Sequence, residues 1–257
     1  MRALAIAASF ALCGVLLGPQ GAGAQAPEPP PTTANAPAAT AVVELYTSQG
    51  CSSCPKADAV LGRLAERDDI ITISWGVDYW DYLGWRDTAA RPEFTERQKA
   101  YAKVLGNGMV YTPQAVINGL AHANGGDEAK IERAIERVSK VFAAARVAVR
   151  LSAADGKLAI EIDAAPQGMG AREATVWLAP IAHRIEVPIT RGENTGKTIV
   201  YSNVARRLIP VGTWNGKSMT VRLDRRSFMP EDADRVAVLL QQGHGGPIVG
   251  AALLPRF

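Results

Sequence analysis

The sequence has few of the residues that usually bind metals, with 3 cysteines and 3 histidines in 257 residues. Four-ligand zinc sites need more of these side chains unless carboxylates contribute, so we expect no bound metal. The chain also lacks an excess of either charge, because 28 Lys and Arg stand against 25 Asp and Glu. This balance excludes the basic surface of a nucleic-acid-binding protein. Hydrophobic residues make up 47% of the chain, enough for a sizeable core.

Long apolar runs are also scarce, and the clearest one lies near the N-terminus, at residues 3–17. It follows an arginine, is short for a bilayer span, and precedes small residues at 22–24. We predict a secretory signal peptide over residues 1–24, a periplasmic or secreted protein, and no stable membrane span after cleavage. A retained anchor is the alternative. Lipidation of Cys13 is disfavoured because a bulky leucine precedes it.

The rest of the chain divides into three regions. Residues 25–40 are rich in proline and alanine and predict a flexible tether. Residues 41–144 alternate strand and helix patterns in the order βαβα followed by ββα, which is typical of an α/β layer fold. Residues 145–257 show two-residue alternation broken by turn residues, which predicts a smaller, all-β, sandwich-like domain. In the α/β domain we expect strands at 41–47, 70–77, 114–118 and 120–123, and helices beginning near 55, 91 and 125.

Cys51 and Cys54 are separated by two serines, between the first strand and its helix. Two thiols at this spacing can close a small disulfide ring, and the free N–H groups and dipole of a helix N-terminus stabilise a thiolate. We expect Cys51, nearer the loop, to be the nucleophile and Cys54 to be the resolving thiol. A structural disulfide and a metal-binding thiol pair are the alternatives.

This strand–CxxC–helix unit, with its βαβ continuation and the sequence Tyr-Thr-Pro-Gln at 111–114 before a hairpin, resembles the thioredoxin-like superfamily. The resemblance covers about residues 41–142. It implies a cis-proline at Pro113 that faces the cysteines, with Thr112 beside it in contact with an extended partner peptide. Thioredoxin has Gly-Pro between its cysteines, whereas this chain has two serines. The resemblance therefore does not determine the reduction potential of the pair.

More narrowly, residues 43–54, 77–85 and 191–194 resemble an exported bacterial family of thioredoxin-like proteins known only as a domain of unknown function, number twelve twenty-three. This resemblance covers nearly all of the chain that follows the predicted signal peptide. It implies the fold and the export of the protein, and it implies no substrate.

Three further residues are candidates for a role near the cysteines. Glu44 lies in an expected central strand, where burying a carboxylate is costly. By analogy with the buried acid of thioredoxins it would accept the proton of Cys54; the alternatives are an exposed strand end or a pair with Lys or Arg. Asp78 follows a strand at its carboxyl end, the edge where open α/β sheets place their sites. Trp80 belongs to an aromatic cluster at 75–85 that either lines a groove or packs between layers.

We therefore predict a thiol-disulfide oxidoreductase that exchanges disulfides with cysteine-containing proteins and is recharged by a redox partner. Its redox group is the Cys51–Cys54 disulfide, with no other cofactor. One alternative is a non-catalytic copper or redox module, in which the two thiolates bind a soft ion. The other is a structural interaction protein on the same fold. We interpret the polar segments at 191–196 and 241–247 as loops between strands.

Overall fold

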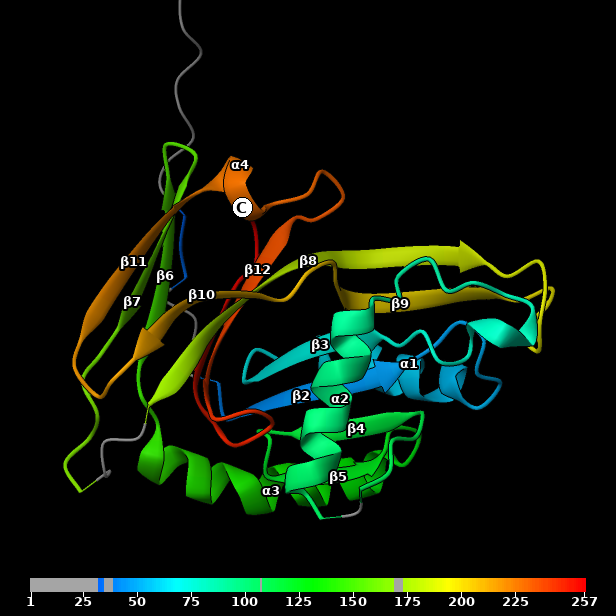
Figure 1. The fold of residues 1–257 in the computed structure, drawn as a ribbon, viewed down its shortest axis with the longest axis horizontal. Helices are drawn as coiled ribbons and strands as arrows, with labels where there is room; N and C mark the ends of the chain where they lie inside the picture. The colour runs from blue at the N-terminus through cyan, green and yellow to red at the C-terminus, as the bar shows by residue number, and fades with distance from the viewer. Residues whose placement is uncertain (1–31, 35–38, 107, 169–172) are drawn as a thin grey trace, which may run out of the picture.

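The computed structural model describes residues 32–34, 39–106, 108–168 and 173–257, so the predicted signal peptide lies outside the described residues. The described chain is a mixed α/β fold made mostly of strands, with one large and one small sheet (Figure 1). The large sheet contains, in spatial order, β13 (Ile248–Leu254), β12 (Arg235–Gln242), β8 (Ala174–Pro188), β9 (Thr198–Ala205), β3 (Ile70–Gly76), β2 (Ala41–Thr47), β4 (Gln114–Ile117) and β5 (Ala121–Asn124), with β10 (Ile209–Trp214) paired to β8.

The small sheet lies at the left of Figure 1, away from the start of the first helix. It contains β1 (Thr32–Ala34), β6 (Val149–Ala154), β7 (Lys157–Ile162) and β11 (Met219–Asp224). The helices are α1 (Cys54–Leu64), α2 (Pro92–Val104), α3 (Glu128–Ala145) and the short α4 (Arg225–Phe228), with one 3-10 turn, η1 (Asp81–Leu83).

Helices cover both faces of the large sheet around β2. Leu45 of β2 packs in one apolar cluster with Leu61 of α1 and Ile135 of α3. Tyr46, the next residue, packs in another cluster with Phe94 of α2. Successive strand residues point to opposite faces, so α1 and α3 lie on one face of β2 and α2 lies on the other.

A buried ion pair ties the α2 face together. Arg97 of α2 donates to Glu44 of β2 over 2.7 Å, and the same carboxylate accepts from Trp75 (2.9 Å) and from the hydroxyl of Tyr101. A second Arg97 nitrogen donates to Gln241 of β12 over 2.8 Å. Burial disfavours the charged guanidinium, but the Glu44 carboxylate outweighs this and holds the pKa of Arg97 above its ordinary value. The network joins β2, α2 and β12.

The expected division at residues 144 and 145 is not confirmed. The chain does change there from the helix α3 to strands, but β9 pairs in parallel with β3, so the large sheet runs across the expected boundary. An unpaired β3 would expose a row of backbone hydrogen-bonding groups, and β9 covers them. Alternation in the sequence shows that a segment is a strand but does not show its partner, which explains the difference.

The expected tether also differs in part. Thr32–Ala34 form the strand β1, which pairs antiparallel with β6 at the edge of the small sheet. Pairing of backbone groups at a sheet edge requires no apolar side-chain pattern, so composition alone does not reveal it. The remaining expected elements of the first region occur close to their predicted positions, as β2, α1, β3, α2, β4, β5 and α3.

Candidate functional site

Cys51 and Cys54 form a disulfide at the start of α1, with Cα atoms 5.4 Å apart. Residues 52 and 53, between them, are exposed, while Cys51 is 3% and Cys54 0% exposed. The Cys51 sulfur lies 3.4 Å from the Ser53 hydroxyl. The exposed tip of the loop therefore lies beside Cys51, while Cys54 is enclosed by protein.

The start of α1 favours a thiolate at this position. The helix has proline in its first turn and no acidic side chain there, so no carboxylate in that turn opposes the positive end of its dipole. Lys56 adds a positive charge in the same turn. Both effects stabilise negative charge on a cysteine sulfur at the helix N-terminus.

The loop before β4 lies close to α1. The Thr112–Pro113 peptide bond is cis, as the resemblance implied. The Pro113 carbonyl accepts from the Gly125 backbone N–H over 3.0 Å. A Cβ on Gly125 would lie 2.6 Å from a methyl of Leu45, 3.0 Å from Ala57 of α1 and 3.2 Å from Pro113. Only glycine fits between these three side chains. Gly125 is therefore the single residue that separates Pro113 from Ala57 of α1.

Trp80 connects the cysteine loop to Thr112. Its indole N–H donates to the Thr112 hydroxyl over 2.7 Å, and a Cβ on Gly50 would lie 3.3 Å from its own Cβ. Tyr82 stacks beside it and is 77% exposed. The aromatic cluster thus divides between the two roles weighed from the sequence, because Trp75 is buried in the core while Trp80 and Tyr82 lie beside the site.

Two of the predicted residues are not brought to the cysteines. Glu44 belongs to the buried network on the α2 face of β2, which is the face opposite α1. Its pairing with Arg97 matches the Lys-or-Arg alternative weighed above. Asp78 accepts from the Thr95 hydroxyl of α2 over 2.7 Å, so its side chain is bound to α2 rather than to the cysteine loop.

The loop between β8 and β9, at residues 189–197, makes a contact that the sequence did not reveal. The buried Asn194 amide donates to the carbonyls of Gln49 and Cys51, each over 3.0 Å. The neighbouring Glu193 accepts from the backbone N–H of Ser52 over 3.3 Å. This loop was expected only to join two strands, yet it holds the cysteine loop in place. The one sequence signal for a role of this loop was that residues 191–194 are among the segments that resemble the family.

A second set of bonds holds the other side of the cysteine loop. The Gln49 N–H donates to Asp87 over 2.8 Å, and the Gln49 side chain accepts from the Trp85 indole over 2.9 Å. Gly192 packs against Trp85, where an added Cβ would lie 3.2 Å away. Hydrogen bonds and packing among the segments around residues 49, 87 and 194 thus hold the disulfide loop in place.

Two buried acids lie near the disulfide, and neither was recognised from the sequence. Asp58 is on the buried face of α1, four residues after Cys54. Burial raises its pKa well above the ordinary value, the Thr47 hydroxyl lowers it, and Asp87 raises it. Burial raises the pKa of Asp87 to about 6, although the backbone N–H groups of Gln49 and Ala89 lower it. A carboxylate on the apolar stripe of a helix was the available sequence signal for Asp58.

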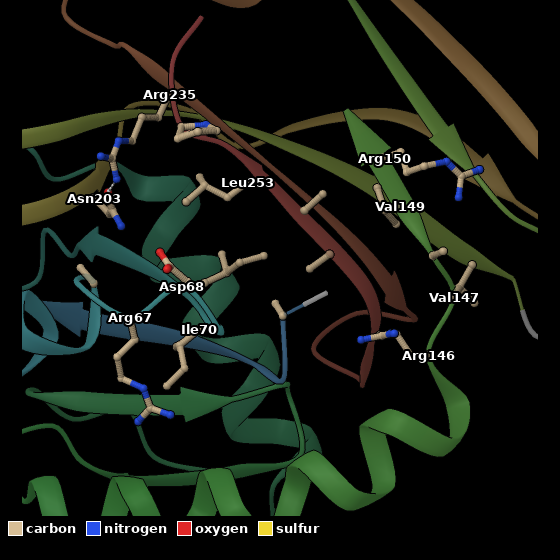
Figure 2. Close-up of a pocket in the computed structure, with 17 residues that line it drawn as sticks. Arg67, Asp68, Ile70, Arg146, Val147, Val149, Arg150, Asn203, Arg235 and Leu253 are labelled. Carbon is tan, nitrogen blue, oxygen red and sulfur yellow. Dashed lines mark hydrogen bonds between the residues drawn. The ribbon is translucent and has the colours of Figure 1, made fainter. Parts of the chain in front are cut away.

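Two hollows differ in their relation to this site. One, of about 590 Å³, is lined by Ser53 and Lys56 together with residues that begin α3. The other, of about 480 Å³, lies where the two sheets meet and contains no residue of the cysteine loop. Figure 2 shows Arg235 and Asn203 at one end of the second hollow and Arg146 at the other. Of these two hollows, the first is the one beside the cysteine loop.

The described residues contain no group of three or more His, Cys, Asp or Glu placed to hold a metal ion. Within the same part of the chain, no helix is long and apolar enough to span a membrane.

Comparison with known proteins identifies the family. The sequence profile described as "Protein of unknown function (DUF1223)" matches residues 42–241, and the chain belongs to this family. The crystal structure of protein AGR_C_4864 from Agrobacterium tumefaciens is similar, with 36% identity and a TM-score of 0.75, over 85% of this chain and 95% of that one. HBP35 of Porphyromonas gingivalis is 12% identical, with a TM-score of 0.50 over 84% of this chain and 74% of that one, which indicates a shared fold. A search of curated proteins gave no match.

The bonds of Asn194 predict a loss of stability when its amide is removed. Asn194→Ala leaves two carbonyls of the cysteine loop without their donor, so we expect the free energy of unfolding to fall by about 2 kcal/mol in denaturant titrations. The exposed neighbour Thr195 provides a control. Thr195→Ala should change the free energy of unfolding by less than about 0.5 kcal/mol. Equal effects of the two variants would contradict the assigned role of Asn194.

The raised pKa of Asp87 predicts a pH dependence of stability. The folded protein binds the Asp87 proton more tightly than the unfolded chain, so stability falls as the pH rises from about 4 through about 6. Asp87→Asn should make this pH-dependent loss of stability smaller by on the order of 3 kcal/mol. Denaturant titrations at several pH values across the same range measure the loss. A variant whose stability falls with pH as steeply as that of the wild type would refute the assignment.

Proposed function

We propose that the chain is a thiol-disulfide oxidoreductase that exchanges disulfides with cysteine-containing proteins. The observation that carries this proposal is the Cys51–Cys54 disulfide at the start of α1, beside the Thr112–Pro113 loop. Strand, CxxC helix, cis-proline and hairpin support a thioredoxin-like unit over residues 41–144. We further propose that the protein is exported to the periplasm or outside the cell, where disulfides persist.

The reaction uses the two sulfurs in turn. In the reduced protein the Cys51 thiolate attacks a disulfide of the partner, one partner sulfur leaves as a thiolate, and a mixed disulfide forms. Cys54 then attacks the Cys51 sulfur, the second partner thiolate leaves, and the Cys51–Cys54 disulfide forms again. The reverse sequence transfers the disulfide to a dithiol partner, and a separate redox protein restores the starting state.

The surroundings of the pair support a partner-binding surface. Trp80 and Tyr82 present aromatic faces beside the loop, and Thr112 lies next to them. We propose that an extended partner segment lies along Thr112 and Pro113, with its cysteine at Cys51. Aromatic side chains that are exposed in pairs supply large contact areas for such binding. Glu44 and Asp78 have no part in this proposal, because their carboxylates bond within the α2 side of the fold.

A purely structural role for the disulfide fits these contacts less well. The ring between Cys51 and Cys54 encloses only two residues, and so short a closure adds little stability. Asn194 and Asp87 hold the same loop by hydrogen bonds from outside the ring. The loop therefore has supports that remain when the disulfide opens, as a pair that cycles between two states needs.

Trapping of mixed disulfides tests the proposed exchange. Cys54→Ala leaves Cys51 without its resolving thiol, so the variant should accumulate covalent adducts with partner proteins, seen as bands lost on reduction and identified by mass spectrometry. Cys51→Ala is the matched control and should trap at least about tenfold less, because Cys51 is the proposed nucleophile and Cys54 is 0% exposed. Equal trapping by both variants, or none by Cys54→Ala in cells that contain the reduced protein, would overturn the proposal.

A further inference from the structure

Cys54 needs a proton acceptor that is built into the protein. It is 0% exposed and sits behind the exposed tip of the cysteine loop. When the disulfide forms, the Cys54 thiol must lose its proton before it can attack, and when the disulfide opens, the Cys54 thiolate must gain one. Bulk water reaches such a sulfur poorly, so an internal group has to exchange that proton.

Asp58 has the position for this exchange. It follows Cys54 by four residues on α1, and both side chains are on the buried side of the helix. Residues at this spacing lie on one face, with Cβ atoms about 6 Å apart, a span that one water molecule can bridge. Asp58 is 3% exposed, and among the described residues its carboxylate oxygens make no hydrogen bond of good geometry, although the Thr47 hydroxyl is near enough to lower its pKa. Buried carboxylates without partners are rare and call for an explanation.

Polar groups from three other segments lie near enough to the Asp58 carboxylate to interact with it electrostatically. The Thr47 hydroxyl comes from β2, the Tyr201 hydroxyl from β9, and the Asp87 carboxylate from the loop before α2. Among the described residues, the Thr47 and Tyr201 oxygens also make no hydrogen bond of good geometry. Asp58 therefore belongs to a buried polar cluster, and such groups are the partners that a buried water molecule needs.

Asp58 also has a route to solvent. It lines a hollow of about 620 Å³ between α1 and β9. The other charged residues around this hollow are Arg63, Glu66, Arg184 and Lys197. A proton taken from Cys54 can therefore leave to solvent through this hollow.

We propose that Asp58 is the proton acceptor and donor for Cys54 during disulfide exchange. This rests on the proposed function and adds a residue to it. In the closing step the Asp58 carboxylate takes the proton of the Cys54 thiol, the Cys54 thiolate attacks the Cys51 sulfur, and the bond from Cys51 to the partner sulfur breaks. The partner leaves as a thiolate, and Asp58 then releases the proton to solvent. In the opening step the same proton moves in the opposite direction.

The environment of Asp58 suits a base for a thiol. A carboxyl group in water is far more acidic than a thiol, so it would rarely hold a proton taken from one. Burial raises the pKa of Asp58, the Thr47 hydroxyl lowers it, and the Asp87 carboxylate raises it. The net increase reduces the difference between the pKa of Asp58 and that of the Cys54 thiol. Glu44 lacks this role because three donors bond it on the opposite face of β2.

A small disulfide separates the two sulfur steps. Reduced protein mixed with one equivalent of dithiodipyridine releases a first thiopyridone when Cys51 attacks and a second when Cys54 closes the ring. We expect Asp58→Asn to leave the first phase within about twofold of wild type and to slow the second about tenfold or more near pH 6. The difference should shrink above about pH 9, where the thiol ionises without help. Asp58→Glu should restore part of the second phase.

Glu66→Gln is the matched control, because Glu66 is an exposed carboxylate on the same hollow. It should leave both phases unchanged. A second phase that is unaltered in Asp58→Asn, or a loss that is equal in both phases and at every pH, would overturn the proposal. The assay uses no partner protein, so its outcome is independent of whether Cys54→Ala traps partners.

Discussion

The contact on which the site depends is the Asn194 amide, which donates to the carbonyls of Gln49 and Cys51 across 145 and 143 positions of sequence. Through it the β8–β9 loop fixes the loop that carries the disulfide. The strand β9 that follows also completes the large sheet by pairing with β3. One segment of the C-terminal half therefore both joins the large sheet at β3 and holds the disulfide loop, which explains why the two halves form a continuous structure.

The site combines two environments around one helix. The tip at residues 52 and 53 faces solvent, beside Trp80 and Tyr82, where a partner can bind. The buried side of α1 contains Asp58 near Asp87, two carboxyl groups that burial makes reluctant to ionise. Such groups reduce stability at neutral pH, and proteins keep them where their proton affinity is useful.

Local patterns in the sequence were enough to find the cysteines, because their spacing depends on neighbours in the chain, and the resemblance to the thioredoxin-like superfamily implied the Thr112–Pro113 loop. The helices and strands from β2 to α3 followed from the same kind of pattern. The roles of Asn194 and Glu193 depend on long-range contacts that no local pattern encodes. For Glu44 the sequence left both a role at the cysteines and a pair with Lys or Arg open, because β2 is buried on both faces and its pattern did not show which face meets α1.

The equilibrium reduction potential of Cys51 and Cys54 tests the central claim most directly, because it distinguishes a disulfide that cycles from one that stays closed. Titration against glutathione or dithiothreitol, followed by the tryptophan fluorescence of Trp80 and Trp85, gives this value. We predict a potential between about −270 and −120 mV, the range of disulfide-exchange proteins. A potential below about −300 mV would mean a permanent structural bond and would contradict the account.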